Sequence, residues 1–170
     1  MIPELITPRL KLRGFMPDDT EPYIAMMMDA EVSRYLGDMK PLSRIDAWRQ
    51  LAMMAGHWVL RGFGIWAVEE RESGRFIGRI GCFEPEGWPS FEIGYTLARS
   101  AWGRGYAREG AGAALHFART KLGRRGIASF IRPANAASIR VATSLGAVHD
   151  GEVELLGAPS LVYRYPDTAG

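Results

Sequence analysis

A β-type run, a glycine-containing turn and a helix follow one another near the middle of the chain and restrict the fold more than any other feature. The run is Glu92–Leu97 and the turn is Trp102–Ala107. Gly123 or Gly126 is expected to end the helix. Small and apolar residues on one helical face predict close packing on a sheet. These residues are Ala107, Ala111, Ala114, Leu115, Ala118 and Leu122.

The rest of the chain switches between β-type and helical periods, with turn residues between the segments. The pattern predicts a mixed α/β (α+β) fold with a twisted central sheet of about six or seven mainly antiparallel strands and helices on both sides. The expected elements are a strand at Leu10–Phe15, helices beginning near Pro17 and Ser43, strands at Phe63–Val68, Phe76–Phe83 and Phe91–Leu97, a helix from Ala107, a strand at Ile127–Arg132, a helix at Ala137–Leu145 and a hairpin of Val153–Leu156 and Leu161–Tyr165.

Length and charge set the class of protein. The 170 residues, 47% of them hydrophobic, suit one domain spanning residues 1–170. A net charge of +2 does not require a nucleic-acid partner. A local group of basic residues suits either a small phosphorylated ligand or a solvated helix face. Its members are Arg99, Arg104, Arg108, Arg119, Lys121, Arg124 and Arg125.

The single cysteine and the apolar runs bear on location. Cys82 lies in an apolar segment, so no intrachain disulfide can form and a buried thiol is expected. No run approaches the roughly 18 apolar residues of a membrane span, and the N-terminus lacks a signal-peptide core. We therefore expect a cytoplasmic protein without a membrane partner.

The turn Trp102–Ala107 has the features of an anion site. The first turn of a helix presents backbone N–H groups without intrahelical partners, and glycine lets an anion approach the backbone. Arg104 and Arg108 would add charge-assisted hydrogen bonds. The Gly-Lys-Ser/Thr ending of a P-loop is absent, and Arg108 stands where a dinucleotide fingerprint needs a small residue. The alternative is a tight strand-to-helix connection without a ligand.

The turn resembles the acyl-CoA signature of the GNAT superfamily of acetyltransferases, Gln/Arg-x-x-Gly-x-Gly/Ala. Trp102 replaces the first position, as is common in the branch resembling the ribosomal-protein N-terminal acetyltransferases. Further motifs of that branch occur in order along nearly the whole chain, with Ala147 in place of a final phenylalanine. They are Thr7-Pro8-Arg9-Leu10-Lys11-Leu12-Arg13, Glu92-Ile93-Gly94-Tyr95, Gly105-Tyr106-Ala107-Arg108-Glu109, Asn135-Ala136-Ala137-Ser138 and Leu145-Gly146-Ala147.

The resemblance implies that acetyl-CoA is the cosubstrate and that no metal takes part. The strand Glu92–Leu97 would splay from its neighbour, and the pantetheine arm would lie in the gap. The pyrophosphate would rest on the amides of residues 103 to 108. Asn135 would hold the pantetheine arm, although it also suits a turn after Pro133. The implied acetyl-CoA contacts are Tyr95, Leu97, Trp102, Gly103, Arg104, Gly105, Tyr106, Ala107, Arg108, Asn135, Ser138 and Arg140.

Acetyl transfer to an amine needs a neutral nucleophile, a polarised thioester carbonyl and a proton for the departing thiolate. Glu92 is the candidate general base, directly or through water, with a surface carboxylate as the alternative. The tyrosine general acid of many relatives is replaced by Ala142. Ser138 is the candidate to bond or protonate the sulfur, and its alternative role is helix capping. A backbone N–H near Tyr95 or Leu97 would polarise the carbonyl.

The sequence thus predicts an N-acetyltransferase acting on a peptide or protein N-terminus, a small-molecule amine or a lysine, as a monomer or homodimer. A catalytically silent acyl-CoA-binding module is the alternative, and a nucleic-acid-binding domain is disfavoured by the charge. The acceptor pocket is expected between the helical region from Met16 to Gly62 and the loop around Gly157. Four aromatic residues suit either that pocket or the core. They are Trp66, Phe83, Trp88 and Tyr163.

Overall fold

The computed structural model describes residues 1–167, so residues 168–170 of the predicted domain lie outside the described residues. Eight strands form one sheet in the order β1-β2-β3-β4-β5-β6-β8-β7. The strands are β1 Leu5–Ile6, β2 Leu10–Arg13, β3 Ile65–Glu70, β4 Arg75–Phe83, β5 Glu92–Leu97, β6 Ala128–Ile131, β7 Val148–Leu155 and β8 Ala158–Arg164. The α-helices are α1 Thr20–Met28, α2 Ala30–Ser33, α3 Arg44–Arg61, α4 Tyr106–Thr120 and α5 Ala136–Ser144. The mixed α/β class with helices on both faces is confirmed.

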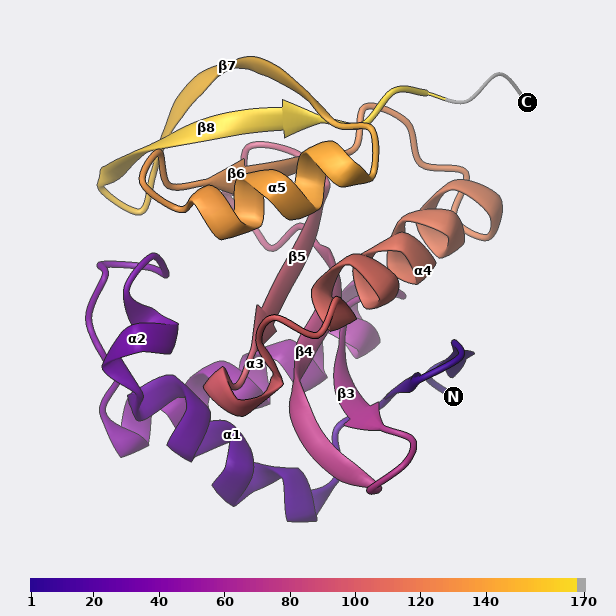
Figure 1. Ribbon diagram of the computed structural model, residues 1–170, viewed down its shortest axis with the longest axis vertical. Helices are drawn as coiled ribbons and strands as arrows, with labels where there is room; N and C mark the ends of the chain where they lie inside the picture. The colour runs from indigo at the N-terminus through magenta and orange to yellow at the C-terminus, as the bar shows by residue number, and fades with distance from the viewer. Residues whose placement is uncertain (168–170) are drawn as a thin grey trace.

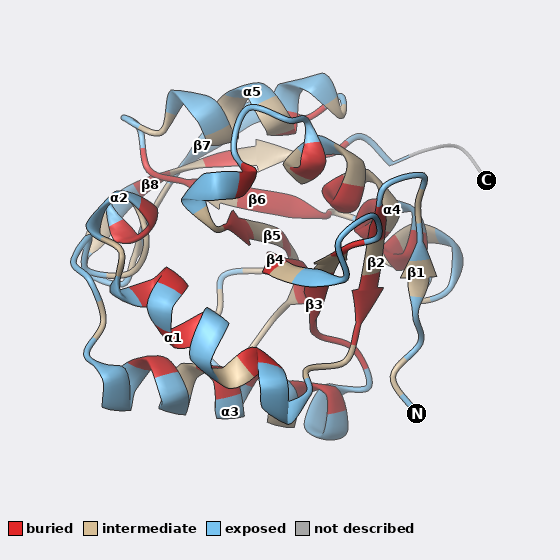
Figure 2. Cartoon of the chain, turned by 60° about the horizontal axis from the view of Figure 1, so that its bottom comes forward, coloured by how far each residue is buried: buried red, intermediate tan, exposed pale blue. Residues whose placement is uncertain are grey.

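Helices cover the sheet on both sides (Figure 1). Helix α4 packs on β2, β4 and β5, and α5 packs on β6 and β8. On the other side, α1 contacts β4 and α3 contacts β3. The central strands are largely buried between these layers, whereas the outward helix faces are exposed (Figure 2). No helix within residues 1–167 is long and apolar enough to cross a membrane.

Strands β5 and β6 separate almost as soon as they meet. Their parallel pairing is confined to one position, Glu92 opposite Ala128. By contrast, β5 pairs with β4 along its whole length, from Glu92 opposite Phe83 to Leu97 opposite Gly78. Figure 1 shows β5 turning away from β6 and its neighbours. Beyond the first pair, one edge of β5 therefore lacks a neighbouring strand, as the resemblance predicts.

Helix α4 lies close to the sheet because its inner face is made of small residues, as the sequence predicts. Ala111, Ala114 and Ala118 are fully buried. At Gly110, a larger residue could not be accommodated without movement, because a Cβ there would lie 2.5 Å from Cδ1 of Ile80 on β4. This close contact fixes where the N-terminal end of α4 points relative to β5.

Several predicted boundaries were wrong. The helical spacing of Tyr23, Met26, Met27 and Ala30 predicts a first helix that reaches Ala30, but α1 ends at Met28. Asp29 adopts an extended backbone (φ −73°, ψ 120°) and caps α2 by accepting from the Glu31 amide at 2.9 Å. Helix α4 ends at Thr120, before either glycine expected to end it. The closing hairpin begins at Val148 rather than Val153, since exposed, polar β7 shows no apolar alternation.

The number of strands also exceeds the six or seven expected. The additional strand, β1, has only two residues, too few for any alternating pattern to reveal it. It pairs with β2 through Leu5 opposite Leu12. Strand β2 itself ends at Arg13 rather than Phe15, because a 3-10 turn at Pro17–Asp19 follows shortly after it.

Candidate active site

The turn before α4 presents a row of backbone amides. Gly103 and Gly105 have positive φ angles of 72° and 79°, a conformation that favours glycine. The amide of Glu109 is the first to bond within the helix, to the Gly105 carbonyl at 3.1 Å. Within residues 1–167, no backbone carbonyl accepts from amides 103 to 108. The helix N-terminus therefore offers these N–H groups to an anion.

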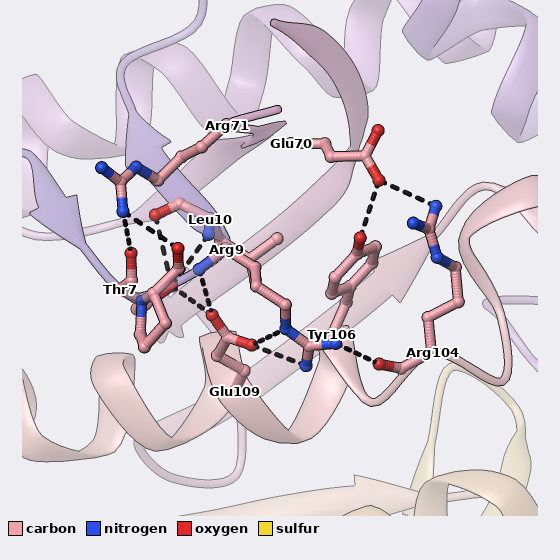
Figure 3. A network of polar contacts seen from close by, with 9 residues as sticks. Thr7, Arg9, Leu10, Glu70, Arg71, Arg104, Tyr106 and Glu109 are labelled. Carbon is pink, nitrogen blue, oxygen red and sulfur yellow. Dashed lines mark hydrogen bonds and ion pairs between the residues drawn. The ribbon is translucent and has the colours of Figure 1, made fainter. Parts of the chain in front are cut away.

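A network of polar contacts holds this turn in place (Figure 3). Glu109 on α4 accepts hydrogen bonds from the Thr7 hydroxyl at 2.6 Å and from the Arg9 amide at 2.8 Å. The Arg9 guanidinium donates to the same carboxylate at 2.7 Å and to the Arg104 carbonyl at 2.8 Å. We call Thr7, Arg9 and Glu109 the N-terminal brace. Burial alone would raise the pKa of Glu109, but the bonds from Thr7 and Arg9 hold it below its usual range.

A second set of contacts anchors the other side of the turn. The buried Tyr106 ring lies between the guanidinium groups of Arg9 and Arg104, 4.7 and 4.8 Å from its centre. Its hydroxyl donates to Glu70 at 2.7 Å. Arg104 also pairs with Glu70, at 2.8 Å, and its side chain is therefore directed away from the open side of the turn. Of the two arginines predicted to bind phosphate, only Arg108 lines the groove described next.

A groove of about 500 Å³ runs from this turn along the C-terminal part of β5, with α5 on its other side. It brings together every residue predicted to contact acetyl-CoA except Arg104. Asn135 caps α5, because its Oδ1 accepts from the Ser138 amide at 3.2 Å. This capping role agrees with the turn alternative, yet it uses only the oxygen. The side-chain NH2 group of Asn135 remains available to a ligand carbonyl.

The open edge of β5 carries backbone groups of alternate residues. On this side, the Ile93 carbonyl accepts from the Ser129 hydroxyl at 2.6 Å and the Leu97 carbonyl accepts from Trp102 Nε1 at 2.8 Å. By the same alternation, the amides of Tyr95 and Leu97 face the gap. Trp102 lies at the C-terminal end of this edge, and its ring is exposed. It is the residue at the first position of the acyl-CoA signature.

A second cavity of about 320 Å³ lies across β5 from the groove. Its walls include the α2–α3 region and the β7–β8 turn, as predicted for the acceptor pocket. Arg132 ties these walls together by donating to the Gly37 carbonyl at 2.6 Å and to the Leu155 carbonyl at 2.9 Å. The two hollows meet where residues line both. These shared residues are Tyr35, Leu36, Tyr95, Thr96, Asn135 and Ser138.

Glu92 lies in the second cavity, at the point where β5 and β6 part. Its Oε2 accepts from Trp88 Nε1 at 2.8 Å, and a longer contact of 3.4 Å joins Oε1 to the Phe130 amide. Burial raises the pKa of Glu92 to about 7, even though Trp88, Phe130 and Arg79 favour its charged form. Glu92 is thus a largely buried carboxylate in the cavity rather than a surface carboxylate on a strand end.

Ser138 lines both hollows, and its backbone supports the helix. Its amide is capped by Asn135, and its carbonyl accepts from the Tyr95 hydroxyl at 2.9 Å. Its own hydroxyl has no hydrogen-bond partner among residues 1–167. Ala142 is fully buried, so the position of the usual tyrosine faces the core. Burial raises the pKa of Tyr95 well above its usual value.

The remaining sequence predictions divide between cavity and core. Phe83 and Trp88 line the second cavity, whereas Trp66 is fully buried in the core and Tyr163 packs beside His149. Cys82 is buried, which raises its pKa to about 12 and confirms the expected buried thiol.

Sequence reasoning missed Arg79 in the cavity and the brace contacts. Thr7 and Arg9 belong to one motif of the family branch and Glu109 belongs to another. These two motifs were the sequence feature from which a contact between them could have been predicted.

Comparison with known proteins identifies the family. A family model described as an acetyltransferase (GNAT) domain matches residues 9–148. The chain therefore belongs to the GNAT acetyltransferases, whose cosubstrate is acetyl-CoA. Its fold and the groove at the start of α4 agree with that class.

Individual relatives support the assignment. The chain is 30% identical over 169 residues to the uncharacterised protein YkkB of Bacillus subtilis (strain 168), covering 95% of this chain and 94% of that protein. The acetyltransferase structure from Agrobacterium tumefaciens str. C58 is similar with a TM-score of 0.88, 30% identity, and coverage of 98% of this chain and 95% of that one. The fold is also similar to RimL, a ribosomal L7/L12 α-N-protein acetyltransferase in complex with coenzyme A, at 17% identity, TM-score 0.76, and coverage of 94% and 95%.

Replacing Glu109 by Gln should loosen the turn, because the variant loses the charge that attracts Thr7 and Arg9. We expect a free energy of unfolding lower by about 2 kcal/mol and coenzyme A affinity weaker by about tenfold. Thermal melts and titration calorimetry measure both quantities. Glu152→Gln, on exposed β7, is the matched control. Unchanged affinity in a folded Glu109→Gln variant would contradict the role of the brace.

The raised pKa of Glu92 should make the free energy of unfolding depend on pH. A carboxyl with a folded pKa of about 7 and an ordinary value of 4.5 binds its proton more tightly in the folded state. The free energy of unfolding therefore loses up to about 3 kcal/mol as pH rises from 4.5 through 7. Glu92→Gln should be more stable than wild type at pH 8 and no more stable at pH 4. Glu86→Gln, at an exposed position, is the control, and a pH-independent difference for Glu92→Gln would refute the assignment.

Proposed function

We propose that this protein transfers the acetyl group of acetyl-CoA to the primary amine of a peptide or protein N-terminus or of a small molecule. The observation that carries the proposal is the junction of two hollows at the open edge of β5. One hollow begins at the exposed amides of residues 103 to 108, and the other contains the carboxylate of Glu92. A donor and an acceptor entering from opposite sides would meet at this junction.

The groove suits coenzyme A at three points. The pyrophosphate would accept hydrogen bonds from the amides of residues 103 to 108, with the charge of Arg108 nearby. The pantetheine amides would bond the open edge of β5 as an added strand does. The Asn135 side-chain NH2 would bond a pantetheine carbonyl from the α5 side. This arrangement would bring the thioester to Tyr95 and Ser138, which line both hollows.

Amine attack forms the C–N bond, and collapse of the tetrahedral intermediate breaks the C–S bond. The amide N–H of Tyr95 or Leu97 would stabilise the oxyanion. The attacking nitrogen must lose a proton, and Glu92 accepts it directly or through water. A base with a pKa of about 7 is suited to this at neutral pH. Neutralising an α-amino group costs only about 1.1 kcal/mol, against about 4.6 for a lysine, so an N-terminal amine needs less help.

Coenzyme A leaves as a thiolate and needs a proton or a hydrogen bond. Ala142 supplies neither, and the half-buried Tyr95 hydroxyl already donates to the Ser138 carbonyl. The Ser138 hydroxyl is free among the described residues and lies at the junction of the hollows. It would donate to the sulfur as the C–S bond breaks, with solvent replacing its proton. This role coexists with the backbone support that Ser138 gives to α5.

A Glu92→Gln variant tests the base. In wild type, kcat/KM for an amine acceptor should rise with pH through about 7 as Glu92 ionises. The variant should lose that limb and about 100-fold in kcat/KM, while acetyl-CoA affinity stays within about twofold. Free thiol released with a panel of amines measures turnover. Full activity in the variant would remove Glu92 from the mechanism. Acetyl-CoA binding without thiol release from any amine would support a silent binding module instead.

A Ser138→Ala variant tests the leaving-group role. We expect kcat to fall about tenfold, because one hydrogen bond to a developing charge is lost. The dissociation constant of acetyl-CoA should change little, since the amide capped by Asn135 is retained. Thr143→Ala is the control, because the Thr143 hydroxyl bonds the Ile139 carbonyl at 2.9 Å on the same helix and the residue lines neither hollow. Unchanged turnover in Ser138→Ala would show that the hydroxyl takes no part.

A further inference from the structure

Arg79 is a cation in the wall of the acceptor cavity, and no side chain or carbonyl within residues 1–167 pairs with it. It lies on β4, opposite Thr96 of β5, and lines the same cavity as Glu92. Its Nε is buried and has no hydrogen-bond partner, the one such side-chain atom within residues 1–167. A buried donor without an acceptor costs free energy that a ligand acceptor would recover.

Two more deeply buried arginines are, by contrast, fully engaged. Arg13 forms bonds of 2.7 Å to both Asp19 and Glu69. Arg132 donates to carbonyls of the α2–α3 region and the β7–β8 turn. Arg79 forms neither an ion pair nor a hydrogen bond within residues 1–167. The fold therefore supplies acceptors for Arg13 and Arg132, whereas Arg79 faces the cavity without one among the described residues.

The nearby titratable groups do not neutralise Arg79. The charge of Arg79 favours the ionised form of Glu92, yet within residues 1–167 no ion pair or hydrogen bond joins the two side chains. The buried Tyr23, from α1, has a raised pKa and is uncharged at neutral pH. Among the described residues, no other charged side chain lines the cavity except Arg132, which is itself a cation. The cavity thus carries a net positive charge on the side of β5 opposite the groove.

We propose that Arg79 binds a carboxylate of the acceptor, so that the acceptor is a small amine that also carries an acid group. The inference rests on the proposed function and names its substrate class. The cavity volume of about 320 Å³ suits a molecule of amino-acid or dipeptide size. The guanidinium fork matches a carboxylate in geometry, and the amine of the same molecule would approach Glu92.

The test compares each amine with its own carboxamide. The pairs are glycine and glycinamide, γ-aminobutyrate and its amide, and ε-aminohexanoate and its amide, which vary the distance from nitrogen to carboxyl. A pair of short peptides, Ala-Asp and Ala-Asn as C-terminal amides, separates a peptide source of the carboxylate from a free amino acid. The measured quantity is the ratio of kcat/KM within each pair, at a pH where Glu92 is ionised.

Wild type should favour the carboxylate member of at least one pair by about 10- to 100-fold, as expected for a charge-assisted hydrogen bond. Arg79→Met should reduce that ratio to about one while keeping acetyl-CoA affinity. It should also melt no lower than wild type, because it removes a buried donor that has no protein acceptor. Arg49→Met, at an exposed position on α3, should keep the ratio.

Two results overturn the inference. One is equal kcat/KM within every pair in wild type, and the other is an unchanged ratio in Arg79→Met. A marked loss of stability in Arg79→Met would show a structural role instead. Binding is scored separately by calorimetry with each carboxylate and amide. If no amine releases thiol, the proposed function fails, and carboxylate binding that depends on Arg79 still decides this inference.

Discussion

The structure depends on the failure of β5 and β6 to remain paired. A buried strand edge normally satisfies its amides and carbonyls with a neighbouring strand, and leaving them unpaired is costly. Here the pairing stops after Glu92 opposite Ala128, and the edge of β5 beyond it faces a groove. Ser129 and Trp102 bond single carbonyls on that edge, at Ile93 and Leu97, which leaves the amides of Tyr95 and Leu97 to a ligand. The gap is therefore both a cost to the fold and the reason that a long, amide-bearing cosubstrate can bind.

The turn before α4 also leaves backbone amides without a protein acceptor, and these amides suit an anion. Its amides are useful only if the turn keeps its shape without the ligand. The N-terminal brace supplies that order by joining the start of the chain to Glu109, while Tyr106 and Arg104 both bond Glu70 (Figure 3). This network of side chains thus keeps the backbone amides of residues 103 to 108 in position beside the groove. Arg104 illustrates the division, since its side chain serves the scaffold while the turn's backbone faces the groove.

Much of this was predictable from local patterns. The β-type run Glu92–Leu97, the small residues of α4 and the glycines of the turn predicted the elements and an anion site. The family resemblance predicted the gap beside β5, and every acetyl-CoA contact that it implied except Arg104 lines the groove. What the sequence could not supply was non-local. Nothing near Arg104 indicates that Glu70 will lie beside it, and β1 is too short to be recognised. Nothing near Arg79 indicates that no group within residues 1–167 will pair with it. The face on which Glu92 lies also needed the register of β4 and β5, which places it in the second cavity.

Amide hydrogen exchange with two ligands tests whether the turn before α4 binds the pyrophosphate and the open edge of β5 binds the pantetheine arm. Coenzyme A carries a pyrophosphate and a pantetheine arm, whereas pantetheine carries the arm alone. We predict that saturating coenzyme A slows exchange both at residues 103 to 108 and along β5, and that saturating pantetheine slows exchange along β5 only. Unchanged exchange at residues 103 to 108 when coenzyme A is bound would show that these amides do not bind the pyrophosphate.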